Sequence, residues 1–208
     1  MTASDVLNPE HPGHPALRIE PLTAVVEPIV FATARGDDAD PALDRMRQGV
    51  ADVRLEVFVG EQDIPFIEEI DARDFEPTTW HVLASGADGV PLGAARLLVE
   101  PEHPGRVHLG RLAVRLTTRR TGLGALLVAA VEEAALEHAA APLDAEAAAA
   151  AGVAPGTRGV TVVLSAQEQA MGFYERCGYR TMTGERYLDA GIWHQDMART
   201  FAVAGALS

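Results

Sequence analysis

Apolar residues recur at three- and four-residue steps in three stretches of the chain, which is the spacing of one face of a helix. The first stretch covers residues 41–58 and begins after Asp38 and Asp40, either of which can cap a helix. The second starts at Leu123, directly after a glycine-rich loop, and the third covers Gln167–Arg176 and ends before Gly178. The pattern therefore predicts three amphipathic helices.

Short runs rich in β-branched and other apolar residues, bounded by turn-forming residues, predict the strands. We expect strands at Glu27–Ala34, Trp80–Ala84, Val90–Val99, Val107–Val114, Gly159–Leu164, Tyr179–Met182 and Ile192–Thr200, with a further short one at Leu17–Leu22. The segment Gly184–Gly191 is expected to link the last two strands. The acidic segment Phe58–Thr79 is expected to be irregular, with short helical turns.

This order of elements predicts an α/β (α+β) fold, because hairpins come early and a strand–helix–strand–helix run follows. We expect one mixed sheet of about six to seven strands with about four flanking helices. A single domain would cover residues 26–202, preceded by an N-terminal arm at residues 1–25. Residues 139–158 are rich in alanine and glycine and are interpreted as an insertion, a helix extension followed by a surface loop.

Composition and charge limit the classes of partner. The chain has 208 residues and a formal net charge of −13, which argues against nucleic acid or an anionic membrane surface and is compatible with a cationic substrate. The one cysteine, Cys177, forms no internal disulfide. We find neither a signal-peptide pattern at the N-terminus nor an apolar run long enough to span a membrane, and therefore expect a cytoplasmic protein.

The loop before the second helix has the composition of an anion site. A helix N-terminus presents unpaired N–H groups, and glycine lets a ligand approach the backbone closely. A Walker A loop would need a Lys-Ser/Thr pair where Ala125-Leu126 stands, and a dinucleotide loop would need a small residue where Leu127 stands. A phosphate or pyrophosphate of another ligand remains, as does the alternative that the glycines serve strand–helix packing. The loop residues are Arg119, Arg120, Thr121, Gly122, Leu123 and Gly124.

The spacing Arg-x-x-Gly-x-Gly in this loop resembles the acetyl-CoA signature of the GNAT acetyltransferases. Three further matches in the right order make the chain similar to the ElaA/YjcF type of that superfamily. They are the segment Val57–Pro65 (VFVGEQDIP), Ala166-Gln167 before the last helix, and Asp189–His194 (DAGIWH). Trp193 departs from the family pattern, which has proline at that position.

The resemblance implies a GNAT fold whose sheet is splayed between the strands at 107–114 and 159–164, with the thioester of acetyl-CoA in the gap. It implies that backbone N–H groups of the loop Arg119–Gly124 hold the pyrophosphate. The pantetheine arm would lie along Leu112, Ala113 and Val114, with Gln167 and Tyr174 near the cofactor. The implied co-substrate is acetyl-CoA, no metal is expected, and the resemblance allows a homodimer.

Transfer to an amine needs a base, because at neutral pH most alkylamines are protonated. His108 is the first candidate, since its ordinary pKa is near neutrality and the resemblance places a base there in some family members. Glu61 is the second, in an acidic loop whose like charges would favour the protonated form. The resemblance suggests Tyr174 as the acid that protonates the leaving thiolate. The alternatives are a packed strand histidine, a solvated acidic loop that attracts a cationic acceptor, and a core tyrosine.

Further residues are expected to line the acceptor pocket, namely Glu61, Gln62, His81 and His194. Cys177 is interpreted as a small buried residue rather than an acyl-enzyme nucleophile. The function expected is transfer of acetyl from acetyl-CoA to a primary amine in a ternary complex. Residues Arg54–Phe58 and Ala95–Leu97 also resemble acyl-homoserine-lactone synthases, which gives one alternative. A non-catalytic acyl-CoA-binding module is the other.

Overall fold

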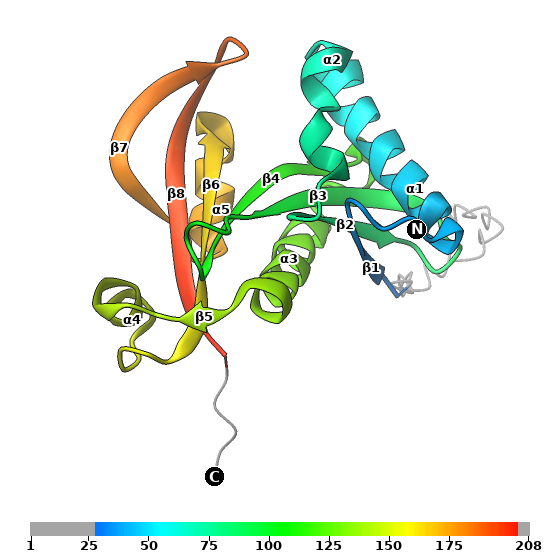
Figure 1. Cartoon of the computed structure of the whole chain (residues 1–208). Coiled ribbons are helices and arrows are strands. Elements are labelled where there is room, and N and C mark those ends of the chain that lie inside the picture. The colour runs from blue at the N-terminus through cyan, green and yellow to red at the C-terminus, as the bar shows by residue number, and fades with distance from the viewer. Residues whose placement is uncertain (1–27, 204–208) are drawn as a thin grey trace, which may run out of the picture.

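The computed structural model describes residues 28–203, so the N-terminal arm and the short strand expected at Leu17–Leu22 lie outside the described residues. One eight-stranded sheet has the order β1-β2-β3-β4-β6-β8-β7, and β5 pairs with β6 outside this path (Figure 1). The strands are β1 Val30–Arg35, β2 Thr79–Ser85, β3 Pro91–Val99, β4 Arg106–Val114, β5 Ala141–Pro142, β6 Arg158–Gln167, β7 Arg180–Asp189 and β8 Ile192–Ala202. The mixed sheet expected from the sequence is confirmed.

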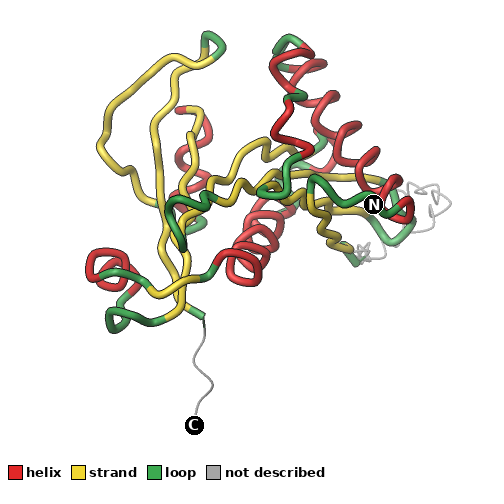
Figure 2. Tube along the Cα trace, viewed as in Figure 1, coloured by secondary structure: helices red, strands yellow, loops and turns green. Residues whose placement is uncertain are grey.

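Helices lie on both faces of the sheet (Figure 2). The α-helices of the described residues are α1 Asp44–Arg54, α2 Phe66–Glu69, α3 Leu123–Ala139, α4 Ala145–Ala151 and α5 Met171–Arg176. The 3-10 turns are η1 Pro41–Leu43, η3 Ala72–Phe75, η4 Leu116–Thr118 and η5 Glu168–Ala170, and the segment Leu55–Glu61 (η2) is π-helical. No helix among residues 28–203 is long and apolar enough to cross a membrane.

Two apolar clusters fix α1 and α3 to opposite faces of the sheet. On the α1 side, Val50 and Val53 pack with Leu83 and Ala94. On the α3 side, the main core contains the buried residues Val82, Ala84, Ala95, Leu97, Val107, Leu109, Leu127, Val131, Val162 and Leu164. Because side chains alternate between the faces of a strand, residues next to these core positions point to the α1 side of the sheet.

The sheet is divided where β4 meets β6, which is its one parallel junction. Pairing there covers only Arg106–His108 opposite Thr161–Val163, after which the two strands part (Figure 1). The other neighbouring strands pair antiparallel. This division is the splayed sheet that the sequence resemblance implied. Among residues 28–203, one edge of β4 therefore has no partner strand from Leu109 onward.

Three segments differ from the sequence prediction. The helix expected at 41–58 is divided into η1, α1 and η2. The segment 139–158 holds β5 and the short helix α4, which is capped by Asp144 and ends at Gly152 with φ 68°. The sequence predicts a helix extension followed by a surface loop here, but alanine is the strongest helix former, so the run forms a helix of its own, with Ala148 fully buried.

The expected link Gly184–Gly191 is mostly strand. β7 continues to Asp189, with a register irregularity between Thr181 and Arg186. Most of its side chains are exposed, so the sequence shows no apolar alternation there. The strand exists because it pairs with β8, which is a contact that a single-strand pattern cannot reveal.

Candidate active site

The open edge of β4 is the backbone of the candidate site. Beyond His108 it faces the gap, and Arg111 adopts φ 53° where the pairing with β3 is irregular. The carbonyl oxygen of Val114 accepts a hydrogen bond of 2.8 Å from Arg119 Nε. An unpaired strand edge can bind an extended chain as though it were a further strand. Leu112, Ala113 and Val114, along which the resemblance implies a pantetheine arm, lie on this open edge.

The loop that follows ends in an uncapped helix. Gly122, with φ 93°, occupies the N-cap position of α3, and no side chain caps this end. The N–H groups of Leu123 and Gly124 have no hydrogen-bond acceptor among the described residues. Free N–H groups and the positive end of the helix dipole favour an anion. This geometry suits an anion, and the anion site that the loop sequence predicts stays a prediction.

The two glycines of the loop are needed at their positions for different structural reasons. A Cβ on Gly122 would meet nothing within 4 Å, but its positive φ favours glycine. A Cβ on Gly124 would lie 3.2 Å from the ring of Phe173. Gly124 therefore allows α3 to approach α5, which is the packing alternative left open by the sequence. Of the two glycines, Gly122 is the one with open space where a side chain would stand.

Glu61 lies beside this loop and pairs with it. Its carboxylate is 2.7 Å from Arg119 Nη2, and the two side chains are about one-third exposed. The prediction that like charges surround Glu61 is thus not matched by its nearest ionic contact, which is an arginine. The neighbouring Gln62 accepts a hydrogen bond of 3.0 Å from Gln167 Nε2 on β6. The motif Glu61-Gln62 therefore contacts both sides of the gap.

His108 is the last residue of β4 that pairs with β6. Its neighbours Val107 and Leu109 belong to the core on the α3 side, so the imidazole points to the α1 side. Burial lowers the pKa of His108 below 6.5, and the charges of Glu100 and Asp196 oppose this in part. A neutral imidazole at the start of the gap is suited to accept a proton.

Tyr174 lies on α5, where its ring contacts Phe173 at 5.0 Å and Tyr179 at 5.9 Å between ring centroids. Burial raises the pKa of Tyr174 well above its ordinary value, so the phenol stays protonated at neutral pH. It packs against the core, as one interpretation expects, and its role as an acid stays a prediction. Burial also raises the pKa of Cys177, which disfavours the thiolate that a nucleophile needs.

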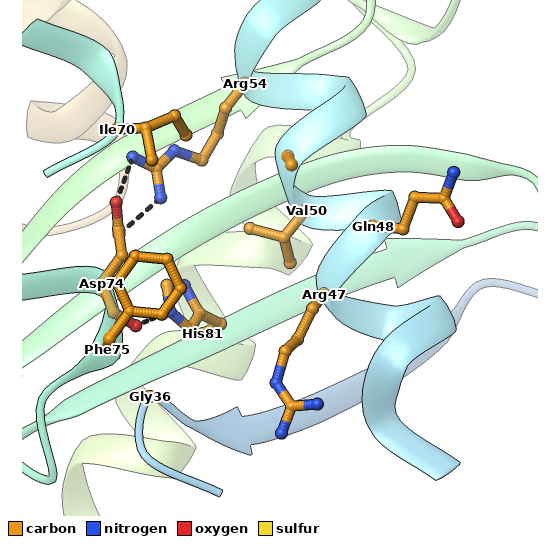
Figure 3. Close-up of a pocket in the computed structure, with 10 residues that line it drawn as sticks. Gly36, Arg47, Gln48, Val50, Arg54, Ile70, Asp74, Phe75 and His81 are labelled. Atoms are coloured by element: carbon orange, nitrogen blue, oxygen red, sulfur yellow. Dashed lines mark hydrogen bonds and ion pairs between the residues drawn. The ribbon is translucent and has the colours of Figure 1, made fainter. Parts of the chain in front are cut away.

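His81 lies apart from the gap, on β2. Its Nε2 donates a hydrogen bond of 2.9 Å to the carbonyl oxygen of Asp74, and burial lowers its pKa. It lines a cavity of about 280 Å³ between α1 and η3 (Figure 3), where Val50 and Phe75 form apolar walls. The structure therefore does not bring His81 together with His194, the other histidine expected at the acceptor pocket.

Beside His81, buried ion pairs fix the acidic segment to the sheet. Arg54, 1% exposed, pairs with Glu69 and lies 2.7 Å from Asp74 Oδ1 (Figure 3). Arg96 lies 3.0 Å from the same oxygen, and Arg111 lies 2.9 Å from Glu69 Oε2. Burial favours the neutral acid, but the hydrogen bond and charge of Arg54 and the charge of Arg96 hold the pKa of Asp74 below its ordinary value.

The sequence interpretation missed a polar cluster on the C-terminal half of the sheet. Tyr187 Oη lies 2.6 Å from Ser165 Oγ and 2.6 Å from Asp196 Oδ1, and Ser165 Oγ donates to the same carboxylate oxygen at 3.0 Å. His194 stacks on Tyr187 at 6.0 Å and donates from Nδ1 to the Ile192 carbonyl. A prediction of β7 through residue 187 would have placed Tyr187 opposite His194, but the exposed strand gave no such signal.

Known proteins share the sequence pattern and the fold of this chain. Residues 47–179 match the acetyltransferase (GNAT) family. The uncharacterized N-acetyltransferase YjcF of Bacillus subtilis is 33% identical over 147 residues, which are 71% of this chain and 87% of that protein. An acyl-CoA N-acyltransferase of Pseudomonas aeruginosa has a similar structure, with a TM-score of 0.62, 28% identity and coverage of 83% and 99%. Escherichia coli ElaA matches with a TM-score of 0.62, 24% identity and coverage of 82% and 99%.

A CoA-dependent acyl-homoserine lactone synthase also has this fold, with a TM-score of 0.61 over 84% of each chain. The identity is 17%, a level at which the likeness is one of fold alone. In the present structure Arg54 and Arg96 are engaged by Asp74 in buried ion pairs. Their resemblance to the synthase pattern is therefore accounted for by a structural role.

Proposed function

The chain belongs to the acetyltransferase (GNAT) family and is of the ElaA/YjcF type, and on this basis we propose that it transfers acetyl from acetyl-CoA to a primary amine. Its membership makes it a transferase with an acyl-CoA co-substrate. The single observation that carries the proposal is the open edge of β4 ending beside the uncapped N-terminus of α3. A strand edge suits the pantetheine amides, and a helix N-terminus suits the pyrophosphate.

The reaction proceeds by direct attack in an ordered ternary complex. The acceptor ammonium gives one proton to His108, directly or through water, and the neutral amine attacks the thioester carbon. A C–N bond forms, the C–S bond breaks, and the nitrogen releases its second proton to water. The thiolate leaves as a thiol with Tyr174 as its proton donor; water then returns a proton to Tyr174 and takes the proton held by His108. Cys177 takes no part, because burial keeps its thiol protonated.

Binding and turnover are tested separately. Acetyl-CoA at about a hundred times its Kd is expected to stabilise the fold by about 2.7 kcal/mol, measured as a rise in Tm. The acetyl thioester of N-acetylcysteamine, which lacks the pyrophosphate, serves as the matched control and is expected to leave Tm unchanged. An unchanged Tm at saturating acetyl-CoA overturns the donor assignment.

Turnover is measured as thiol release in the presence of a panel of primary amines. The chain contains no lysine, so acetylation of its own lysine side chains adds no background. Release with at least one amine supports the enzyme, whereas a Tm rise without thiol from any amine favours the non-catalytic acyl-CoA-binding module. S-adenosylmethionine belongs in the panel, because release with it alone favours an acyl-homoserine-lactone-synthase-like activity.

A further inference from the structure

The polar cluster Ser165–Tyr187–Asp196 stands on three adjacent strands beside the gap. Ser165 on β6 faces Asp196 on β8 in register, and Tyr187 reaches them from β7. The hydroxyl groups of Ser165 and Tyr187 both donate to Oδ1 of the Asp196 carboxylate. Burial and the hydrogen bond to Asp196 raise the pKa of Tyr187, so its hydroxyl stays a donor. The cluster thus holds the carboxylate in one orientation, with Oδ2 directed elsewhere.

The cluster lies on the same side of the sheet as the candidate base. Val163 pairs with His108 in the last residue pair between β4 and β6, and Ser165 lies two residues further along β6. Residues two apart on a strand share a face, so Ser165 and Gln167 point to the α1 side as His108 does. Gln167 demonstrates this direction, since its amide meets Gln62 from the other side of the gap. In Figure 1 the β7–β8 hairpin rises at the left and α2 at the upper right, with β6 and β4 between them.

Asp196 has no ionic partner among residues 28–203. The arginines of β7 and β8 bond elsewhere: Arg186 pairs with Glu168, Arg199 lies 2.8 Å from Glu132, and Arg180 donates to the carbonyl oxygen of Tyr179. A half-buried carboxylate with no counter-ion is an attractive site for a cation, because part of its hydration is already lost. The net charge of −13 draws cations toward the molecule in general.

The register gives the distance between this carboxylate and the base. Asp196 is two strands away from His108 and two residues further along, which places their Cα atoms about 12 Å apart. Because the two side chains rise from the same face, their ends are separated by about the same distance, and a hydrogen bond at each end leaves roughly 5–7 Å between two ligand nitrogens. This is the span of a linear diamine with about four carbons.

We propose that the acceptor is a small aliphatic diamine whose non-reacting ammonium binds Asp196 while its other amine is deprotonated at His108. This inference rests on the proposed acetyl transfer and specifies its substrate class. Asp196 is a substrate-binding residue here, and Tyr187 and Ser165 are positioning residues that act through it. Acetylation of one end yields a monoacetylated diamine, which retains one cation.

The test compares 1,4-diaminobutane with n-pentylamine, a monoamine of matched length, in thiol release by the full chain with saturating acetyl-CoA. The wild-type protein is expected to favour the diamine at least 20-fold in kcat/KM. Asp196→Asn keeps the shape and removes the charge, and is expected to reduce this preference to less than threefold, mainly through KM for the diamine. Asp189→Asn, on the same hairpin, is the control and is expected to keep the preference.

A second variant guards against a folding defect. Asp196→Glu moves the carboxylate outward and is expected to shift the preferred diamine from four carbons toward three. Turnover of both amines without discrimination by the wild type overturns this inference and leaves acetyl transfer intact. An equal loss of kcat/KM for both amines in Asp196→Asn, with Tm unchanged, also overturns the inference. Thiol release from no amine overturns both the inference and the proposed function.

Discussion

Glu61 pairs with Arg119 across the entrance of the anion site. Arg119 Nη2 lies 2.7 Å from the carboxylate, while Arg119 Nε donates to the carbonyl oxygen of Val114. The guanidinium is therefore held at two points, one on the strand edge and one on η2. In this arrangement Glu61 positions an arginine beside the loop that would take the pyrophosphate, which differs from the base role expected for it.

Glu61→Gln separates these two roles. The amide keeps a hydrogen-bond acceptor for Arg119 and removes a negative charge near an anion site. The Kd of acetyl-CoA, measured by calorimetry, is therefore expected to fall by about two- to fivefold, the scale of a partly exposed pair. The value of kcat is expected to stay within threefold. A general base would instead lose about 10²–10⁴ in kcat.

Glu56→Gln is the matched control, because Glu56 pairs with Arg115 at 3.0 Å on the same segment. It is expected to change neither Kd nor kcat by more than twofold. A hundredfold loss of kcat in Glu61→Gln, with the Kd of acetyl-CoA unchanged, would restore Glu61 as the base.

Tyr174→Phe tests the proton donor. The ring that packs against Phe173 and Tyr179 remains, so Tm is expected to change by less than about 2 °C. Loss of the hydroxyl is expected to lower kcat by about 10²-fold, the lower limit for acid catalysis. Tyr179→Phe, a neighbouring buried tyrosine, is expected to keep kcat. Equal kcat in wild type and Tyr174→Phe would leave Tyr174 as a core aromatic residue.

Gly124→Ala tests the packing role of the second glycine. The added Cβ would lie 3.2 Å from the Phe173 ring, so the ring must shift, and we expect a loss of about 1–3 kcal/mol in unfolding free energy. Phe173→Leu in the same chain makes room, and the double variant is expected to recover part of that loss. Denaturant unfolding measures all three variants. Strict additivity of the two single changes would contradict the contact.

The pH dependence of kcat tests His108. Burial lowers its pKa, so the imidazole stays neutral, and competent as a base, to a pH below its ordinary value. The acidic limb of kcat is therefore expected to have its midpoint below 6.5. His108→Gln is expected to remove the limb and lower the plateau, whereas His138→Gln, on α3, should keep both. An unchanged limb in His108→Gln would assign it to another group.

Asp74→Asn tests the buried ion pairs. It leaves Arg54 and Arg96 without the carboxylate they share, and removal of one partner from a buried pair costs about 3–5 kcal/mol. Since the pKa of Asp74 is lowered by folding, its contribution is present above about pH 4 and is lost as the pH falls through the folded value. Asp37→Asn, in an exposed pair with Arg35, is the control in urea unfolding and is expected to cost less than 1 kcal/mol. Equal stability of the two variants would show that the pairs contribute little.

The elements that the sequence predicted best are those with a strong apolar period or a local motif. The strand Val107–Val114, the loop Arg119–Gly124 and the helix after it lie where expected, because their signals are contained in a few neighbouring residues. The splay was available only through resemblance. It depends on pairing between β4 and β6, which are some fifty residues apart. The sequence of one strand does not identify the strand that pairs with it.

The contacts of the site were harder to predict for the same reason. Glu61 meets Arg119 at a sequence separation of 58, and Gln62 meets Gln167 at a separation of 105. Tyr187 was missed because its strand is exposed on both sides and carries no apolar pattern. His81 was expected at the acceptor because of its residue type, whereas its surroundings place it in a buried cluster.

The junction between β4 and β6 comprises only three residue pairs. Beyond His108 and Val163 the facing backbone N–H and C=O groups of these two strands form no strand-to-strand hydrogen bonds with each other. A ligand with amide groups at the spacing of a strand can take up bonds of this kind, so the edge would distinguish ligands by their hydrogen-bonding groups before any side chain contacts them.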